Sequence, residues 1–392
     1  MHRLLPLFAA VALSSLACER KSPPPPPSAP ATSEQRVPAR EGPIVIGMLG
    51  SLTGSEASFG TVVRDGIQFA VEQVNAAGGV KGRQVELRAY DTQGKLEESV
   101  AAAKRLLTQD KVVLILGDVT SSGSLAIADA VQAARVPMVT PSSTHPEVTK
   151  KGDFIFRTCF IDPFQGGAMA RFARENLKLE RVAVLHDSKN ASSLGLSEAF
   201  IAAFQKLGGT VVAVESYAKG DSDYRAPLLA VKKAKPQALY LPGFYSEVGV
   251  IARQAREMGL TLPLLGGDGW ESDRIFELAG GALEGASYSS HYAEDNPASE
   301  LQRFITSFRE RYGRSPEAAS ALGYDAAKVA LAAIERAKSL SGPDIRDALA
   351  ATKDHPGATG SLTLDADRNP VKPAVILTIR EGKRRFAAAV TP

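Results

Sequence analysis

Four hydroxyl side chains follow a short apolar segment in the first third of the chain. The segment is Val112–Leu116, and the hydroxyls belong to Thr120, Ser121, Ser122 and Ser124. A stretch with helical character begins in the same turn, and a helix start offers unpaired amides and a partial positive charge. Hydroxyl groups beside it add further donors, so the pattern favours an anion-binding turn. Helix capping alone would need only one of these hydroxyls.

A second turn of the same kind follows the next apolar segment. After Pro137–Val139 the chain reads Thr140-Pro141-Ser142-Ser143-Thr144. In open α/β sheets, ligands bind beyond the carboxyl ends of the strands, which is where both turns are expected to lie. Neither turn contains Arg or Lys, and the chain has no glycine-rich phosphate loop. The two turns therefore favour a carboxylate over a phosphate.

Short apolar segments alternate with amphipathic helical segments along most of the chain. The alternation starts at Ile44 and restarts after Ile161–Pro163. It predicts an α/β fold with two doubly wound lobes, each a parallel sheet covered by helices on both faces. The expected strands are 44–49, 85–90, 112–116, 137–139, 181–185, 210–215, 238–241, 262–265, 362–364 and 374–379. The expected helices are 63–74, 97–109, 125–134, 194–207, 228–235, 248–258, 298–312 and 316–338.

Size and charge restrict the class of function. The 392 residues carry a formal net charge of +3 with Lys and Arg spread along the chain, so no nucleic-acid partner is expected. From Gly42 onward about 350 residues remain, which is more than one core usually covers, so two domains are expected. The five histidines lack metal-ligand spacing, and no H-E-x-x-H or G-x-S-x-G motif occurs. We therefore expect no enzyme and no metal site; His186–Asp187 could form an acid/base pair, but a solvated loop at the end of a strand is the commoner case.

The N-terminal segment has the features of an exported, anchored protein. Residues 4–17 are mostly apolar but too few to span a membrane, which predicts a lipoprotein signal peptide over residues 1–18. Ser15–Cys18 resembles a lipoprotein cleavage site, at which Cys18 becomes the lipidated first residue; an ordinary secretion signal is the alternative. The proline-rich residues 19–42 are expected to form an extended linker. Cys159 is the only other cysteine, and we expect it to be a small buried hydrophobe without a disulfide.

Several longer stretches resemble the branched-chain amino acid-binding proteins of bacterial ABC importers, which are type I periplasmic binding proteins. The stretches are IVIGMLGSLTG, GIQFAVEQVNAAGGVKGRQVEL, VTPSSTHPEVT, FRTCFIDPFQG, VAVLHDS and IARQAREMGL. The resemblance covers the chain from Gly42 onward and implies two lobes joined by a three-strand hinge. It assigns residues 43–161 and 293–357 to lobe I, and residues 162–292 and 358–392 to lobe II.

In the family that the chain resembles, the two lobes close on one small molecule. The resemblance therefore implies a monomeric binding protein without a cofactor, located in the periplasm or at the cell surface and anchored to the membrane. Its partners would be a small α-amino acid and an ABC permease in the inner membrane. Two alternatives stay open: a cargo such as a short amide, urea or an aromatic acid, and a ligand-sensing receptor module with the same fold.

The resemblance also implies which residues contact the ligand. Ser121, Ser142 and Thr144 match positions that hold the carboxylate of an amino acid and help to place its ammonium group. Phe59 in lobe I and Phe244 in lobe II match aromatic residues of the pocket. These assignments agree with the anion-binding character of the two hydroxyl-rich turns.

Asp268 matches an acidic residue that binds the ligand's ammonium group, which suits a zwitterion held by donors on one lobe and a carboxylate on the other. Leucine-type members have a longer Glu at this position. Two aromatic pocket residues of the family are missing, one near Ser192 and one near Ala319. Trp270, the only tryptophan, is expected either to replace part of that surface or to pack on the surface of its lobe. The side-chain pocket differs, so the identity of the ligand does not transfer.

Overall fold

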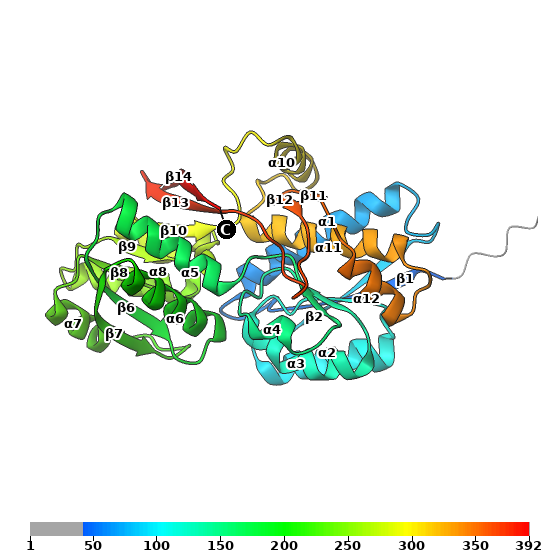
Figure 1. Cartoon of the computed structure of the whole chain (residues 1–392), viewed down its shortest axis with the longest axis horizontal. Helices are drawn as coiled ribbons and strands as arrows, with labels where there is room; N and C mark the ends of the chain where they lie inside the picture. Colours follow the sequence, from blue (N-terminus) through cyan, green and yellow to red (C-terminus); the bar gives the residue numbers. More distant parts are fainter. Residues whose placement is uncertain (1–41, 392) are drawn as a thin grey trace, which may run out of the picture. The chain divides into compact units, whose positions relative to one another are not determined.

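The computed structural model describes residues 42–391, which contain two large sheets with helices packed against each (Figure 1). The predicted signal peptide, Cys18 and nearly all of the proline-rich linker lie outside the described residues. Within the described part of the chain, none of the helices has the length and apolar character that a membrane crossing requires.

The first sheet consists of five parallel strands in the order β2-β1-β3-β4-β5. The strands are β1 (Ile44–Gly50), β2 (Val85–Asp91), β3 (Ile115–Leu116), β4 (Met138–Thr140) and β5 (Ile155–Arg157). The helices between them are α1 (Ala57–Ala76), α2 (Leu96–Arg105) with its continuation η1 (Leu106–Asp110), α3 (Ser121–Ala134) and α4 (Glu147–Lys150). Three later helices pack against α1 or against each other: α10 (Ser299–Tyr312), α11 (Ala318–Arg336) and α12 (Gly342–Ala350). We call this part lobe I.

The second sheet has seven strands in the order β14-β13-β10-β9-β8-β6-β7. The strands are β6 (Arg181–Asp187), β7 (Thr210–Tyr217), β8 (Ala238–Tyr240), β9 (Leu264–Gly266), β10 (Ser287–Ser290), β13 (Ala374–Arg380) and β14 (Lys383–Val390). The helices are α5 (Asp162–Arg171) with η2 (Phe172–Asn176), α6 (Ala191–Lys206), α7 (Arg225–Ala234), α8 (Tyr245–Glu257), η3 (Asp268–Trp270), α9 (Arg274–Ala279) and η4 (Gly280–Leu283). We call this part lobe II, and with lobe I it confirms the predicted α/β fold.

The chain passes between the two lobes three times, after β5, after β10 and after β12. The three crossing segments are residues 158–161, 291–298 and 363–373. The strand β12 (Gly360–Leu362) pairs with β11 (His355–Gly357) in a separate hairpin. The predicted lobe boundary between residues 357 and 358 falls inside this hairpin, so the third crossing begins only after Leu362.

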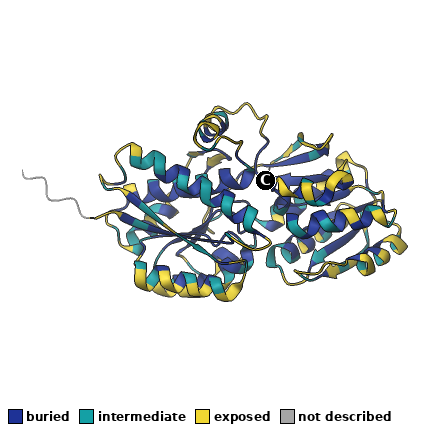
Figure 2. Ribbon diagram, turned by 180° about the vertical axis from the view of Figure 1, so that it is seen from behind, coloured by how far each residue is buried: buried dark blue, intermediate teal, exposed yellow. Residues whose placement is uncertain are grey.

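The apolar periodicity of the sequence becomes the buried face of each helix. On α1, Val63, Ile67, Ala70 and Val71 are buried and join the main hydrophobic cluster. The strand β1 is buried along nearly its whole length, as expected for a central parallel strand covered on both faces. In Figure 2 the strands are mostly buried, and the exposed residues gather on the outer faces of the helices.

Two strands of lobe II are not predicted by the apolar pattern. The strand β10 reads Ser-Tyr-Ser-Ser, and β14 consists of exposed and half-buried residues only. The β10 hydroxyls are satisfied inside the lobe, since Ser287 pairs with the hydroxyl of Thr378 (2.9 Å) and Ser290 donates to the carbonyl of Tyr292 (3.1 Å). Because β13 runs antiparallel to both β10 and β14, the sheet of lobe II is mixed at this edge.

Helices α1 and α11 approach each other at backbone distance, and glycines permit it. A Cβ at Gly66 would lie 1.9 Å from the carbonyl oxygen of Ser320, and one at Gly323 would lie 2.3 Å from that of Val63. We expect Gly66→Ala to lower the free energy of unfolding by about 3 kcal/mol, because the two helices must move apart. Urea titration measures this change. The control is Gly167→Ala on α5, where no atom lies within 4 Å of the added carbon; an equal loss in both variants would contradict the explanation.

Candidate functional site

Hydrogen bonds connect the two hydroxyl-rich turns of lobe I. The hydroxyl oxygens of Ser124, Thr140 and Ser143 all lie within hydrogen-bond distance of the carbonyl oxygen of Asp118, at 3.0, 2.7 and 3.1 Å. The side chains of Ser124 and Ser143 also share a hydrogen bond of 2.8 Å. These three hydroxyls are fully buried and serve the fold of the turns. Only part of the hydroxyl pattern is therefore available for a ligand.

Three other hydroxyl residues of these turns, Thr120, Ser121 and Ser142, line a cavity between the lobes. Ser121 accepts a hydrogen bond from the amide of His145 (3.1 Å), so its own hydroxyl hydrogen is left to donate elsewhere. Ser142 donates to the carbonyl of Val119 (2.6 Å). Ser121 and Ser142 were candidates for the carboxylate site, and the structure brings them to the same wall of the cavity.

Residues of both lobes line this cavity. Phe59 at the start of α1 and Phe244 just before α8 face each other across it, with their ring centroids 5.8 Å apart and tilted by 54°. The free space is about 20 Å³, which fits one water molecule, so a larger ligand requires the lining residues to move apart. The lining residues are Phe59, Thr120, Ser121, Ser142, Asn190, Ser192, Ser193, Leu196, Pro242, Gly243, Phe244, Asp268 and Gly269.

Two helices, one from each lobe, begin at the cavity. Thr120 is the N-cap of α3, since its side-chain oxygen accepts from the amide of Gly123 (3.2 Å). Asn190 is the N-cap of α6 and accepts from the amide of Ser193 (3.0 Å). The two helix starts are joined directly, because the hydroxyl of Ser122 accepts from the amide of Ala191 (3.1 Å). Two helix N-termini at one cavity favour a negatively charged group on a ligand.

Asp268 brings a carboxylate to the same cavity from lobe II. It is 8% exposed, and each of its oxygens meets one buried side chain. Oδ1 accepts from the side-chain amide of Gln165 (2.9 Å), and Oδ2 lies 3.0 Å from Nε2 of His291. A carboxylate oxygen can accept more than one hydrogen bond. Asp268 therefore keeps capacity for a cationic group in the cavity.

Thr144 does not line the cavity but forms a contact between the lobes beside it. Its hydroxyl pairs with that of the lining residue Ser192 (2.8 Å). Both hydroxyls lie close to the carboxyl group of Asp162, the first residue of α5, which is fully buried. Burial raises the pKa of Asp162 to about 8, and the nearby negative charge of Asp268 adds to the increase.

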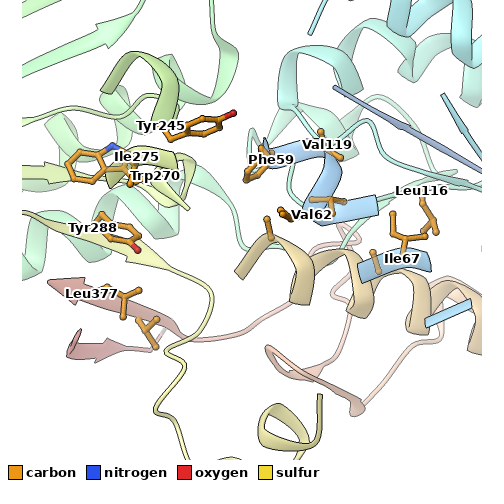
Figure 3. Close-up of a cluster of buried hydrophobic side chains, with 14 of the residues drawn as sticks. Phe59, Val62, Ile67, Leu116, Val119, Tyr245, Trp270, Ile275, Tyr288 and Leu377 are labelled. Atoms are coloured by element: carbon orange, nitrogen blue, oxygen red, sulfur yellow. The ribbon is translucent and has the colours of Figure 1, made fainter. Parts of the chain in front are cut away.

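Trp270 corrects one expectation from the sequence. Its ring is 0% exposed inside lobe II, neither in the cavity nor on the surface of the lobe. The indole nitrogen donates to the carbonyl of Leu241 (3.0 Å), and the ring lies beside Tyr288, with centroids 5.7 Å apart (Figure 3). The ring packs directly on the backbone of Gly266, which has no Cβ to obstruct it. Trp270 thus supports the loop that carries Asp268 and replaces no pocket surface.

A second group of contacts joins the lobes close to Phe59. The hydroxyl of Tyr245 on α8 donates to the carbonyl of Ser55 (2.8 Å) and accepts from the amide of Ser58 (3.2 Å). Figure 3 shows Phe59 and Tyr245 on the elements of different lobes. Lys219 in lobe II forms an ion pair with Glu56 in lobe I (2.6 Å), and Glu56 is buried. These contacts join the two lobes beside the cavity.

The described residues do not support metal binding or thiol chemistry. Residues 42–391 contain no group of three or more His, Cys, Asp or Glu side chains that could hold a metal ion. Cys159 is buried, and burial raises the pKa of its thiol to about 12, as expected for a packing residue. The cavity between the lobes has hydrogen-bond donors on one side and a carboxylate on the other.

A family model and individual relatives of known name both place the chain in one protein family. The model of a family described as periplasmic binding protein matches residues 43–384. The Leu/Ile/Val-binding protein homolog 3 of Brucella melitensis is 34% identical over 322 residues, which cover 82% of this chain and 86% of that protein. A leucine-, isoleucine-, valine-, threonine- and alanine-binding protein of Pseudomonas aeruginosa is 33% identical over 326 residues, which cover 82% of this chain and 86% of that protein.

Solved structures agree with these relatives. The leucine-binding protein LivK from Thermotoga maritima superposes with a TM-score of 0.86 at 39% identity, covering 89% of this chain and 99% of that chain. The branched-chain amino acid transporter substrate-binding protein LivJ from Streptococcus pneumoniae, in complex with isoleucine, superposes with a TM-score of 0.85 at 33% identity, covering 89% of this chain and 100% of that chain.

Proposed function

The chain belongs to the periplasmic binding protein family, and from this premise we propose that it binds a small α-amino acid between its two lobes for an ABC importer. Family members are substrate-binding proteins of transport systems and not enzymes. Relatives named for leucine, isoleucine and valine, and a solved structure with isoleucine, support an amino acid as the ligand class.

The opposite polarity of the two cavity walls is the observation that carries this proposal. Ser121 and the start of α3 offer donors on the side of lobe I, and Asp268 offers a carboxylate on the side of lobe II. An α-amino acid carries both charges on adjacent groups, so one molecule can satisfy both walls. Micromolar affinity corresponds to about −8 kcal/mol, and a hydrogen bond to a charged group supplies about 1.5–3 kcal/mol. Several such bonds, together with apolar burial, are sufficient.

The apolar part of the cavity supports a hydrophobic side chain on the ligand. Phe59, Phe244, Leu196 and Pro242 contribute apolar surface between the two polar walls. Burying a side chain of the size of Val or Leu gains about 1.5–3 kcal/mol. The chemistry of a branched-chain amino acid therefore matches both the polar and the apolar lining, and its binding requires the lobes to separate.

We extend the proposal to the location and the partners of the protein. Cys18 would carry the lipid anchor, residues 19–42 would act as the tether, and the remainder would act as a monomer with lobes divided near residues 161, 292 and 362. The partner would be a permease of an ABC importer in the inner membrane. Cys18→Ser should abolish metabolic labelling by a radioactive fatty acid, and labelling that persists in the variant would exclude this anchor.

A thermal-shift panel tests the proposed ligand class. A ligand that binds only the folded protein raises its melting temperature, by an amount that follows its concentration and affinity. We expect leucine, isoleucine or valine to raise the melting temperature, and the amides and decarboxylated amines of the same amino acids to have little effect. A shift with urea, short amides or aromatic acids, and none with amino acids, would replace this proposal with the corresponding cargo.

A further inference from the structure

The carboxylate of Asp268 is held by two side chains that do not line the cavity. Gln165 on α5 donates one hydrogen to Asp268 (2.9 Å) and the other to the hydroxyl of Ser289 on β10 (2.8 Å). His291, the residue that follows β10, contacts the other carboxylate oxygen at 3.0 Å. Gln165 is completely buried and His291 is 3% exposed, so water does not compete for either contact.

The protonation of His291 follows from its surroundings. Burial lowers the pKa of its ring to about 4, against the opposing effect of the hydrogen bond to Asp268, so the imidazole is neutral near pH 7. A neutral imidazole carries one hydrogen. Nδ1 has no hydrogen-bond partner among the described residues, whereas Nε2 faces a carboxylate oxygen. The hydrogen therefore sits on Nε2, and His291 donates to Asp268.

His291 also connects this contact to the hinge. Its ring stacks on that of Phe160, with centroids 3.8 Å apart and an angle of 14° between the planes. Phe160 belongs to the first crossing segment, and His291 begins the second. Lys372 in the third crossing segment is buried and interacts electrostatically with both His291 and Asp268. All three crossing segments thus contribute to the environment of one carboxylate.

We propose that His291 and Gln165 are positioning residues that fix the orientation of the Asp268 carboxylate, so that its free lone pairs are presented to the ammonium group of the ligand. The inference rests on the proposed function and deepens it. Without these donors, the carboxylate of a short Asp side chain would be free to rotate away from the cavity. His291 lies in the hinge. The affinity of Asp268 for the ammonium group therefore depends on how the hinge segments pack.

The test compares two ligands that differ only in the ammonium group, L-leucine and 4-methylpentanoate. We measure their affinities by calorimetry, directly or in competition, for the wild-type protein and for His291→Leu, His291→Gln and His355→Leu. We expect His291→Leu to weaken leucine binding by about tenfold or more and 4-methylpentanoate binding by less than about threefold. His291→Gln keeps an N–H donor and should restore most of the preference for leucine. His355 lies on β11, away from the cavity, and serves as the control.

Each outcome decides one question. If the wild-type protein does not prefer leucine over 4-methylpentanoate, no ammonium group is recognised, and both the proposed function and the positioning role fall. If the wild-type protein shows the preference and His291→Leu keeps it, only the positioning role is overturned. If His291→Leu weakens both ligands equally, the residue serves the packing of the hinge alone, and the positioning role is again overturned.

Discussion

Replacing Asp268 with Asn is expected to weaken the binding of L-leucine by about 100-fold and to leave the melting temperature of the ligand-free protein nearly unchanged. The side chain is almost fully buried at the cavity, so a charged hydrogen bond to the ligand is poorly replaced by water. Removing one partner of a buried charged pair costs about 2–5 kcal/mol, and about 3 kcal/mol corresponds to about 100-fold. The Asn amide keeps the shape of the side chain, and its NH2 group can donate to Nε2 of His291 once the imidazole hydrogen moves to Nδ1, which limits the effect on folding.

The control for Asp268→Asn is Asp273→Asn, the same chemical change five residues further along the chain. The side chain of Asp273 is 73% exposed, pairs with Arg384 and does not line the cavity. Isothermal calorimetry with L-leucine should show wild-type affinity for Asp273→Asn. An unchanged affinity in Asp268→Asn, or an equal loss in both variants, would remove Asp268 from the ligand site.

The pattern of apolar residues predicts most of the fold because its physical cause is local. The apolar stripe 63–74 lies on α1, and the strands predicted at 44–49 and 181–185 are β1 and β6 within two residues at either end. The expected strand 112–116 shortens to β3 (Ile115–Leu116), although Val112 and Leu114 are buried as well. Apolar residues indicate that a segment is buried, but they do not distinguish a strand from a buried extended loop. The apolar pattern does not predict strand β10, because the buried residues of this strand are mostly serines.

The sequence predicts part of the candidate site, and there is a physical reason why it does not predict the rest. Phe59, Ser121, Ser142, Phe244 and Asp268 follow strand ends or begin helices, and the structure brings all five to one cavity. Their roles toward a ligand stay predictions. Not every hydroxyl of the two turns is available to a ligand, because Ser124, Thr140 and Ser143 satisfy a buried carbonyl group, which composition alone does not reveal.

The residues that support the site could not be found from the sequence. Gln165 meets Asp268 across 103 residues of chain, and His291 meets it across 23. Neither lies in a turn with unusual composition, and their role depends on how two strands and a helix pack in lobe II. Asn190 is the exception, since a helix cap before Ser192 and Ser193 follows from the known preference of Asn for that position. For Trp270 the error has the opposite direction. The sequence places this tryptophan next to the site, but its side chain packs in the core of lobe II.

Asp162 gives a second large expected effect, on the dependence of stability on pH. Burial raises the pKa of its carboxyl group to about 8, whereas an unfolded chain has a value of about 3.9. Between these values the folded protein binds more protons than the unfolded chain, so the free energy of unfolding falls as pH rises. The groups around Asp162 are Thr144 and Ser192, the charges of Arg157 and Asp268, and the ring of His145. No oxygen of Asp162 has a hydrogen bond of good geometry among the described residues.

Asp162→Asn removes this ionisation and should therefore stabilise the protein most at alkaline pH. We expect the melting temperature of the variant to match that of the wild-type protein near pH 4 and to exceed it increasingly up to pH 8, where the gain in the free energy of unfolding is about 5 kcal/mol. Melting curves at half-unit steps of pH measure the difference. Asp153→Asn is the matched control with the opposite sign, because hydrogen bonds from Gln132 and Arg346 lower the pKa of Asp153. That variant should lose a little stability above pH 4. A difference between Asp162→Asn and wild-type protein that does not change with pH would show that Asp162 stays charged in the folded chain, and the argument from its burial would then fail.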